Sequence, residues 1–252
     1  GLGDVYKRQV SNNMDYLSRA VDHEISELLD SLAAVSIEGP KGVGKTETAK
    51  RIAKTIRELD DPAVQAIASA DTQQLLKGEN PILLDEWQRV PAIWDAVRRA
   101  VDKDSKPNQF LLTGSASPAN PPTHSGAGRV VTVRMRPLAL FERKLITPSV
   151  SFADLLQGNK PAMSGDSTFG LAEYVEEIVR SGFPGMRHLS GRALRAQLDG
   201  YLTRIVDRDF QEQGLNLRNP EGLRRWMAAY AAATATTASF EKIRDASTSG
   251  NG

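Results

Sequence analysis

The residues Gly39-Pro-Lys-Gly-Val-Gly-Lys45-Thr46 decide the fold of this chain. They match the phosphate-binding loop pattern G-x-x-x-x-G-K-[ST] at every fixed position. The apolar residues 33–37 before them are typical of a short buried strand, and residues 47–58 after them carry apolar side chains at helical spacing. A loop that joins a strand to a helix in this way predicts an α/β fold, with a parallel sheet flanked by helices, that binds a nucleoside triphosphate.

The chemistry of a polyphosphate explains the residue types in this loop. Glycines permit backbone torsions that side chains would block, so successive N–H groups can turn toward phosphate oxygens at the positive end of the helix dipole. We expect Lys45 to neutralise charge on the β- and γ-phosphates and Thr46 to offer its hydroxyl to Mg²⁺. The residues expected to bind the nucleotide are Gly39, Pro40, Lys41, Gly42, Val43, Gly44, Lys45, Thr46 and Glu47.

A second apolar run, residues 81–84, ends in the acids Asp85 and Glu86. Ligands of an α/β sheet bind off the carboxyl ends of its strands, so Asp85 is expected to complete the Mg²⁺ shell beside the loop. Glu86, one residue further on, is the better candidate for a base that orients or deprotonates the attacking water. The alternative is an acidic pair that merely opens the next helix with favourable N-terminal charges.

A third apolar run, residues 109–112, is followed by the hydroxyl residues Thr113 and Ser115. Either hydroxyl could sense the γ-phosphate or hold the water, and we favour Thr113 because it follows the strand directly. The alternative is a Ser/Thr turn without a role in catalysis. Residues 117–128, which are rich in proline and glycine, are expected to form a loop that stays mobile until a ligand orders it.

Arg129 lies at the end of this loop, and Arg134 and Arg136 follow in a strand-like segment. An arginine at the phosphates would stabilise the charge that develops during phosphoryl transfer, either within its own subunit or in a neighbour, which would require a homo-oligomer. Arg129 is the preferred candidate for this catalytic role. The alternative is a solvated basic strand edge.

The rest of the sequence predicts mostly helices. Residues 15–32 predict an amphipathic helix that packs beside the first strand. Asp71 either ends a short strand over residues 67–71 or, as we prefer, caps a helix ahead of residues 73–76. Later helices are expected at residues 152–156, 171–180, 192–213, 223–237 and 240–246. We expect a core domain over residues 11–147, a linker and helical segment over residues 148–218, and an incomplete winged-helix-like segment over residues 219–252.

Composition excludes several classes of site. The chain of 252 residues contains no cysteine and three scattered histidines, which excludes disulfides and thiolate metal sites and argues against zinc. A net charge of +1 indicates no particular partner. The sequence has no apolar run long enough for a membrane span and no secretion signal pattern, so we expect a cytoplasmic protein.

Five further motifs give the chain a specific resemblance to a family. They are Leu83-Leu-Asp-Glu-Trp-Gln-Arg-Val-Pro91, Leu112-Thr-Gly-Ser-Ala116, His124-Ser-Gly-Ala-Gly-Arg129, Arg134-Met-Arg-Pro-Leu138 and Gly182-Phe-Pro184. Together with the phosphate-binding loop they resemble bacterial and archaeal AAA-type P-loop ATPases that carry the C-terminal region DUF4143. The resemblance spans residues 16–246.

This resemblance implies a P-loop ATPase core, a helical and winged-helix segment, and a further C-terminal domain. It supports the same residues for the same roles: Lys45 and Thr46 in the loop, Asp85 and Glu86 at the strand end, Thr113 at the sensor position, and Arg129 as the arginine. It also favours ATP over GTP, as does the lack of a guanine-recognition signature. Relatives of this kind run on well past residue 252, so we expect a fragment, and residues 1–10 resemble a translated adapter sequence.

The functional prediction is an ATPase that uses Mg²⁺ and couples its nucleotide state to a C-terminal module. The alternative is a nucleotide-controlled switch that binds DNA through a winged helix and hydrolyses little. Residues 171–252 carry 11 Lys and Arg against 10 Asp and Glu, so no basic stripe supports DNA binding. A small-molecule kinase is disfavoured because the chain supplies no convincing acceptor pocket.

Overall fold

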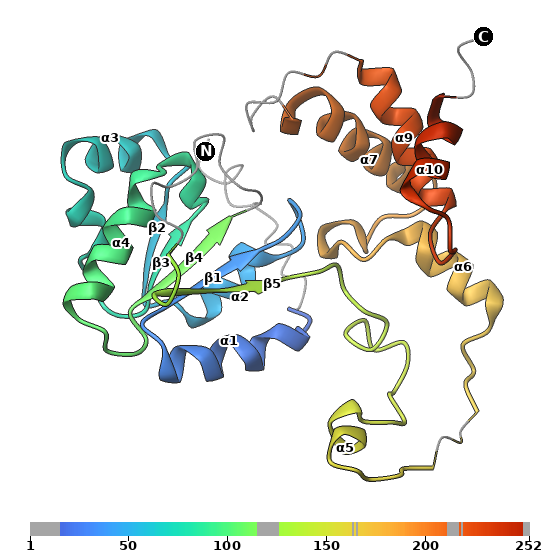
Figure 1. Ribbon diagram of the computed structural model, residues 1–252, viewed down its shortest axis with the longest axis horizontal. Helices are drawn as coiled ribbons and strands as arrows, with labels where there is room; N and C mark the ends of the chain where they lie inside the picture. The colour runs from blue at the N-terminus through green and yellow to red at the C-terminus, as the bar shows by residue number, and fades with distance from the viewer. Residues whose placement is uncertain are drawn as a thin grey trace, which may run out of the picture.

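The fold is built on a parallel sheet of five strands in the order β2-β3-β4-β1-β5 (Figure 1). The computed structural model describes residues 16–114, 126–162, 164, 166–210, 217 and 219–248. The strands are β1 (Ala34–Glu38), β2 (Thr55–Glu58), β3 (Ile82–Asp85), β4 (Phe110–Gly114) and β5 (Val130–Arg134). All four strand pairings are parallel. The predicted α/β class is therefore confirmed.

The central strands are apolar throughout because both faces of the sheet are covered. All residues of β3 and β4 are buried, as expected for parallel strands between two layers of helices. Because side chains alternate along a strand, β1, β3 and β4 each contribute to two separate cores.

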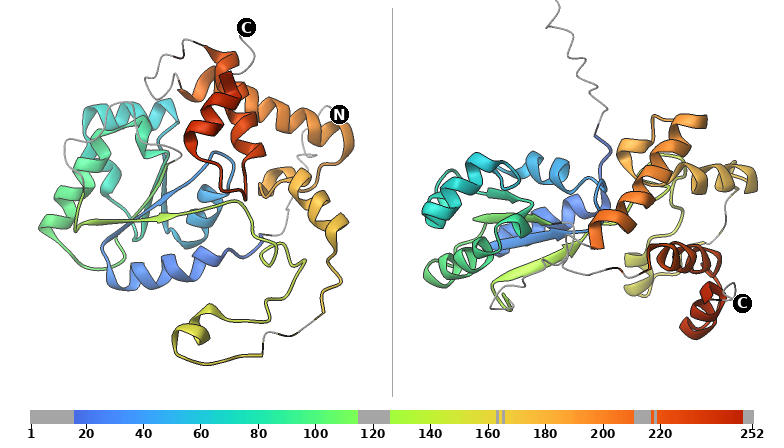
Figure 2. Two further views of the ribbon diagram at one scale, coloured as in Figure 1. Left: turned by 45° about the vertical axis from the view of Figure 1, so that its right-hand side comes forward. Right: turned by 90° about the horizontal axis from the view of Figure 1, so that it is seen from above.

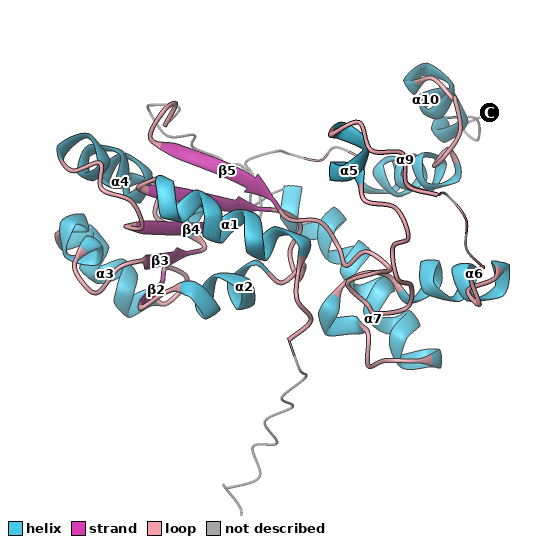
Figure 3. Ribbon diagram, turned by 90° about the horizontal axis from the view of Figure 1, so that it is seen from below, coloured by secondary structure: helices cyan, strands magenta, loops and turns pink. Residues whose placement is uncertain are grey.

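Helices α1 (Ala20–Ser31) and α2 (Lys45–Ile52) cover one face of the sheet, and α3 (Pro62–Ala70) and α4 (Ala92–Lys103) cover the other (Figures 1 and 3). The first core contains Ile25, Leu29, Val35, Ile37, Val43, Ala49, Leu83, Leu111, Val133 and Met135. The second contains Ala34, Leu84, Ile93, Trp94, Val97, Phe110 and Leu112 among others. This packing fixes the strands whose carboxyl ends carry the site.

Strand β2 corrects one expectation. The helix expected over residues 47–58 ends at Ile52, because Ala53 is extended and the following residues pair with β3. Ile52 and Ile56 have helical spacing, so the sequence pattern did not reveal the change from helix α2 to strand β2. The preferred interpretation of Asp71 is confirmed: its side chain accepts a hydrogen bond of 2.9 Å from the Gln73 amide and caps the short helix η1 (Thr72–Leu76).

The regular elements of the described chain after β5 are all helices, joined by loops. They are α5 (Phe152–Leu156), α6 (Leu171–Arg180), η3 (Pro184–Met186), α7 (Gly191–Arg204), the π-helix η4 (Ile205–Asp209), α9 (Pro220–Ala232) and α10 (Phe240–Thr248). They lie beyond the carboxyl ends of the strands, and α7 approaches the sheet there (Figures 1 and 2). No strand follows Arg134 among these described residues, so the winged helix stays a prediction.

Some expectations fall outside the described residues. These are the leader at residues 1–10, the hydroxyl of Ser115, and residues 117–125 of the loop expected to be mobile. In the ranges that are described, no helix combines the length and the apolar character needed to cross a lipid bilayer. The proposed domain boundaries stay predictions as well.

Candidate functional site

The phosphate-binding loop joins the carboxyl end of β1 to the N-terminus of α2, as predicted. Gly42 and Gly44 have φ angles of 76° and 105°, which side chains rarely adopt, and Gly44 caps α2. A side chain at Gly39 would overlap the backbone carbonyl of Met135 in the neighbouring strand connection. The three glycines of the loop are therefore required by backbone torsion and by close approach.

Lys45 is the first residue of α2, and its ammonium folds back over the loop. Its Nζ donates to the carbonyl oxygens of Gly39 and Pro40, each at 3.0 Å, and the residue is 4% exposed. Burial lowers the pKa of Lys45, and the nearby charges of Glu86 and Asp85 partly offset this effect. A buried ammonium that donates to neutral carbonyl oxygens is electrostatically favourable for an arriving anion.

Asp85 brings two neighbouring elements together at the carboxyl edge of the sheet. Its Oδ1 accepts a hydrogen bond of 2.9 Å from Thr46 Oγ1 and a second, short one from Thr113 Oγ1. Asp85 and Thr113 end the adjacent strands β3 and β4, and Thr46 begins α2. The structure thus brings three of the predicted site residues together, with two hydroxyls on one carboxylate.

This arrangement fits a Mg²⁺ ion. A hydroxyl and a carboxylate are hard oxygen ligands, and Mg²⁺ is usually held by one or two carboxylates, waters and substrate phosphates rather than by an all-protein cage. The described residues contain no group of three or more His, Cys, Asp or Glu side chains able to hold a metal.

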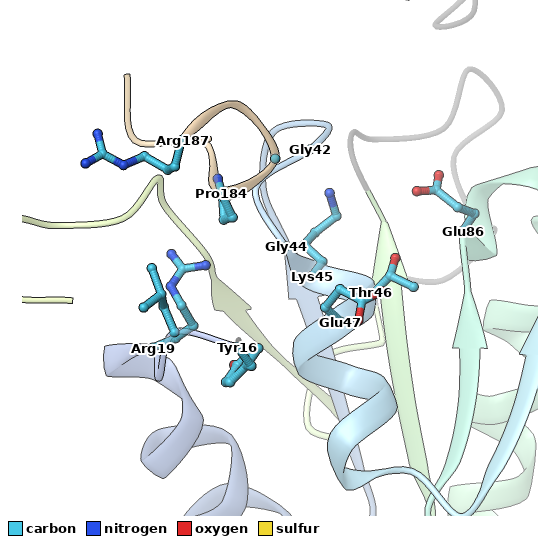
Figure 4. Close-up of a pocket in the computed structure, with 12 residues that line it drawn as sticks. Tyr16, Arg19, Gly42, Gly44, Lys45, Thr46, Glu47, Glu86, Pro184 and Arg187 are labelled. Atoms are coloured by element: carbon cyan, nitrogen blue, oxygen red, sulfur yellow. The ribbon is translucent and has the colours of Figure 1, made fainter. Parts of the chain in front are cut away.

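Glu86 sits in a left-handed backbone conformation, with φ 55° and ψ 44°. Its amide donates to Thr113 Oγ1 at 3.3 Å, and its carboxylate accepts a short hydrogen bond from Gln88 Nε2. Left-handed backbone at a residue other than glycine is a source of strain that is often found at functional sites. The kink turns the partly exposed Glu86 toward the loop, where it lines the same cavity as Lys45 (Figure 4).

Arg129 does not join this group, which corrects the expectation of a role within its own subunit. It immediately precedes β5, whose first residue, Val130, is paired with Ala34 at the amino end of β1. The phosphate-binding loop follows the opposite end of β1. The guanidinium of Arg129 instead binds Asp102 at the end of α4, with Nε 2.7 Å from Oδ1. A role in a neighbouring subunit is a separate prediction.

The cavity beside the loop contains residues that the sequence did not single out. Its volume is about 450 Å³, and segments from four parts of the chain line it (Figure 4). The additional lining residues are Tyr16, Leu17 and Arg19 before α1, and Pro184, Gly185 and Arg187 at η3. The motif Gly182-Phe-Pro184 was the only signal for the second group, and it came from the family resemblance.

Arg19 ties the N-terminal segment to the loop. Its Nη1 donates to the Val43 carbonyl at 2.9 Å, its Nη2 donates to the Arg136 carbonyl at 2.5 Å, and its Nε lies 3.3 Å from Glu142 Oε1. The side chains of Arg19 and Glu142 are only 4% and 6% exposed. Glu142 also accepts from the amides of Ala20 and Ala139. This buried ion pair therefore holds the loop backbone in place.

A second buried carboxylate holds the η3 turn. Glu177 Oε2 lies 2.7 Å from Arg143 Nη1 and 2.6 Å from Arg187 Nη1. Burial would raise the pKa of Glu177, but the hydrogen bonds from Arg187 and Arg143 outweigh burial and keep the pKa below its ordinary value. Because Arg143 follows β5, this cluster connects the core to the helical segment at the cavity.

Comparison with known proteins agrees with this geometry. Residues 32–144 match the family model described as an AAA domain. That segment contains all five strands, the phosphate-binding loop and the acidic end of β3. This part of the chain is therefore similar to AAA domains over its whole sheet.

The curated relatives are longer than the chain. Uncharacterized proteins of Mycobacterium tuberculosis and Mycobacterium bovis are each 27% identical over 198 residues, which is 76% of this chain and 39% of the relative. The chain thus spans about two fifths of the length of the curated relatives it matches. DUF4143 is not shown by these comparisons.

Two solved structures are distantly similar. A Walker-type ATPase of Pyrococcus abyssi has a TM-score of 0.44 and 16% identity, covering 93% of this chain and 89% of that chain. AMPPCP-bound DnaA from Aquifex aeolicus has a TM-score of 0.33 and 18% identity, covering 92% and 85%.

Proposed function

We propose that this chain binds ATP with Mg²⁺ and hydrolyses its β–γ phosphoanhydride bond. One observation carries the proposal: a single carboxylate oxygen of Asp85 accepts hydrogen bonds from both Thr46 and Thr113 beside the buried ammonium of Lys45. These groups come from three elements that meet at the carboxyl edge of the sheet, where α/β folds bind their ligands.

The triphosphate would lie along the loop and the N-terminus of α2. Backbone amides of the loop would donate to its oxygens, and the ammonium of Lys45 would exchange its two carbonyl acceptors for phosphate oxygens. Thr46 and Asp85 would hold Mg²⁺. When bound there, Mg²⁺ would supply positive charge that offsets the negative charge of the phosphates.

Glu86 would act on the attacking water. It is one residue beyond Asp85, and the left-handed kink directs its carboxylate to the cavity that Lys45 also lines. The hydrogen bond from Gln88 would fix the orientation of this carboxylate, and the Thr113 hydroxyl would hold the Glu86 backbone. Glu86 is therefore the proposed base, and Thr113 a group that positions both acids.

The nucleoside would occupy the part of the cavity between the N-terminal segment and η3. Tyr16 contributes an aromatic ring that lies under the Arg51 guanidinium, 4.3 Å from the ring centroid. Burial raises the pKa of the Tyr16 hydroxyl to about 12, so the ring carries no charge at neutral pH. Leu17 and Pro184 complete an apolar surface suited to a base. Adenine is proposed because of the AAA-domain match.

The test is Glu86→Gln, which preserves shape and removes the base. We expect the variant to bind Mg²⁺-ATP as the wild type does and to lose phosphate release by about 100-fold or more. Glu79→Gln, on an exposed residue away from the site, is the control and should leave both measurements unchanged. Hydrolysis by Glu86→Gln at the wild-type rate would remove Glu86 as the base.

The alternative, a DNA-binding switch with little hydrolysis, lacks a favourable observation. The near balance of acidic and basic residues over residues 171–252 offers no electrostatic surface for phosphates of DNA. Coupling of nucleotide state to the helical segment is better supported, because side chains of α7 and η4 contact the phosphate-binding loop directly.

A further inference from the structure

Side chains from two distant segments donate hydrogen bonds to backbone carbonyls of the phosphate-binding loop. Arg19, which precedes α1, donates from Nη1 to the Val43 carbonyl oxygen at 2.9 Å. Tyr201, which lies on α7, donates its hydroxyl to the Lys41 carbonyl oxygen at 3.1 Å. The backbone of the loop is therefore held both by the N-terminal segment and by the helical segment.

A hydrogen bond at a carbonyl also fixes the amide of the same peptide group. In a planar trans peptide the C=O and N–H bonds point in opposite directions, and the peptide bonds of the loop are trans. Because the Lys41 carbonyl turns toward Tyr201, the Gly42 amide turns away from α7. The Val43 carbonyl sets the direction of the Gly44 amide in the same way.

Gly42 lies between two cavities. It lines the nucleotide cavity (Figure 4), and it also lines a second cavity of about 320 Å³. Tyr201 and Lys41 are among the described residues that line the second cavity, and neither lines the first. The Tyr201 hydroxyl thus occupies the carbonyl on the side of the second cavity, and the opposed Gly42 amide is left for the nucleotide cavity.

The Gly42 amide is available to a ligand. Among the described residues, no backbone or side-chain acceptor takes a hydrogen bond from this amide or from that of Gly44. Successive backbone N–H groups that are free and fixed in direction form a concave site for anions. A donor that already points at the site needs no reorientation when a phosphate arrives, which favours binding.

The helical segment sets the position of the Tyr201 hydroxyl. The Tyr201 ring packs against that of Phe183, with 4.9 Å between the centroids. Burial raises the pKa of the Tyr201 hydroxyl, so it stays a neutral donor at pH 7. A second contact joins the same two segments, because Lys41 Nζ lies 2.7 Å from Oδ1 of Asp209 in η4.

We infer that Tyr201 is a positioning residue of the phosphate site, which orients the Gly42 amide toward a phosphate oxygen of the bound nucleotide. The inference rests on the proposed function and adds a residue of the helical segment to it. An amide that donates to a phosphate makes the carbonyl of its own peptide a stronger acceptor, since hydrogen bonds in a chain polarise one another. By linkage, nucleotide binding would then tighten the hold of Tyr201, and so of α7, on the loop.

The test compares Tyr201→Phe with the wild type, using the whole chain. The variant keeps the ring that packs against Phe183 and removes only the donor. Calorimetry should show Mg²⁺-ATP binding weakened by about threefold to tenfold, because the hydrogen bond that orients one phosphate donor is lost. At saturating Mg²⁺-ATP, amide hydrogen exchange in α7 should slow in the wild type and should not slow in Tyr201→Phe.

Tyr230→Phe is the matched control. It removes the same hydroxyl from a tyrosine of α9 that packs against Trp226 and lines neither cavity, and it should leave ATP affinity and α7 exchange as in the wild type. Melting curves check that each variant folds. A purely structural role of Tyr201 would lower the Tm and leave ATP affinity unchanged.

Unchanged ATP affinity in Tyr201→Phe, or equal slowing of α7 exchange by Mg²⁺-ATP in both proteins, would overturn the inference alone. Absence of ATP binding by the wild type would overturn the proposed function together with it.

Discussion

The substitution Arg19→Met tests how the core holds the phosphate-binding loop. It replaces a guanidinium that is 4% exposed by an apolar side chain of similar length, and it leaves the carboxylate of Glu142, 6% exposed, without its charged partner. Removing one member of a buried ion pair costs about 3–5 kcal/mol. The carbonyls of Val43 and Arg136 also lose their guanidinium donors, so a value in this range is expected rather than a smaller one.

The assay is thermal unfolding followed by circular dichroism or calorimetry. For a chain of this size, about 3–5 kcal/mol corresponds to a fall in Tm of roughly 6–20 °C. ATP affinity should fall as well, because the loop residue Val43 loses a contact that orders it. Arg244→Met, at an exposed pair with Asp245, is the control and should change stability by about 0.5 kcal/mol or less.

A double-mutant cycle isolates the pair from general damage. Glu142→Gln alone should also destabilise the fold, since it leaves the Arg19 charge buried. The double variant Arg19→Met with Glu142→Gln should lose clearly less than the sum of the two single losses, because neither unpaired charge remains. Strictly additive losses, or a Tm for Arg19→Met within about 2 °C of the wild type, would refute the role assigned to this pair.

Three further predictions concern the site and its surroundings. Arg129→Ala should leave ATP turnover within about twofold of the wild type in dilute solution. The reason is that its guanidinium binds Asp102, at the end of the sheet opposite the phosphate-binding loop. Loss of turnover only at high protein concentration would indicate a contribution between subunits. Thr113→Val should lower the rate of phosphate release more than ATP affinity, because the hydrogen bond to Asp85 is lost while the fold is preserved. Equal effects on rate and affinity would contradict the positioning role of Thr113. The pKa of Glu177 is lowered in the folded state, so its carboxylate stabilises the fold above pH 4.5. This contribution is lost as the pH falls through the folded-state pKa. The difference in Tm between wild type and Glu177→Gln should therefore shrink between pH 7 and pH 3.

The sequence predicted the elements whose signals are local. The phosphate-binding loop, the buried strands β1, β3 and β4, and the helices α5, α6, α7, α9 and α10 follow from periodicity and from glycine and hydroxyl positions. The helix expected over residues 223–237 ends earlier, at Ala232 of α9. The proximity of Asp85 to Thr46 followed from one rule about parallel sheets. These features need no knowledge of distant contacts.

The sequence did not predict the features that depend on tertiary contacts. Strand β2 lies at the edge of the sheet and alternates between partly exposed and exposed residues, so its short polar sequence has no strand signal of its own. Arg129 was misplaced because its position depends on where β5 starts relative to β1. The contributions of Arg19, Pro184 and Asp209 to the loop and its cavity come from residues far away in sequence, whose meeting no local pattern reports.

The most direct measurement of the central claim is a calorimetric titration of the whole chain with ATP in the presence of Mg²⁺. The proposed site predicts saturable binding at one site per chain, and a sharp loss of affinity in Lys45→Ala, whose melting curve should match that of the wild type. Absence of heat with a well-folded wild-type sample, or unchanged affinity in Lys45→Ala, would contradict the account of the phosphate-binding loop.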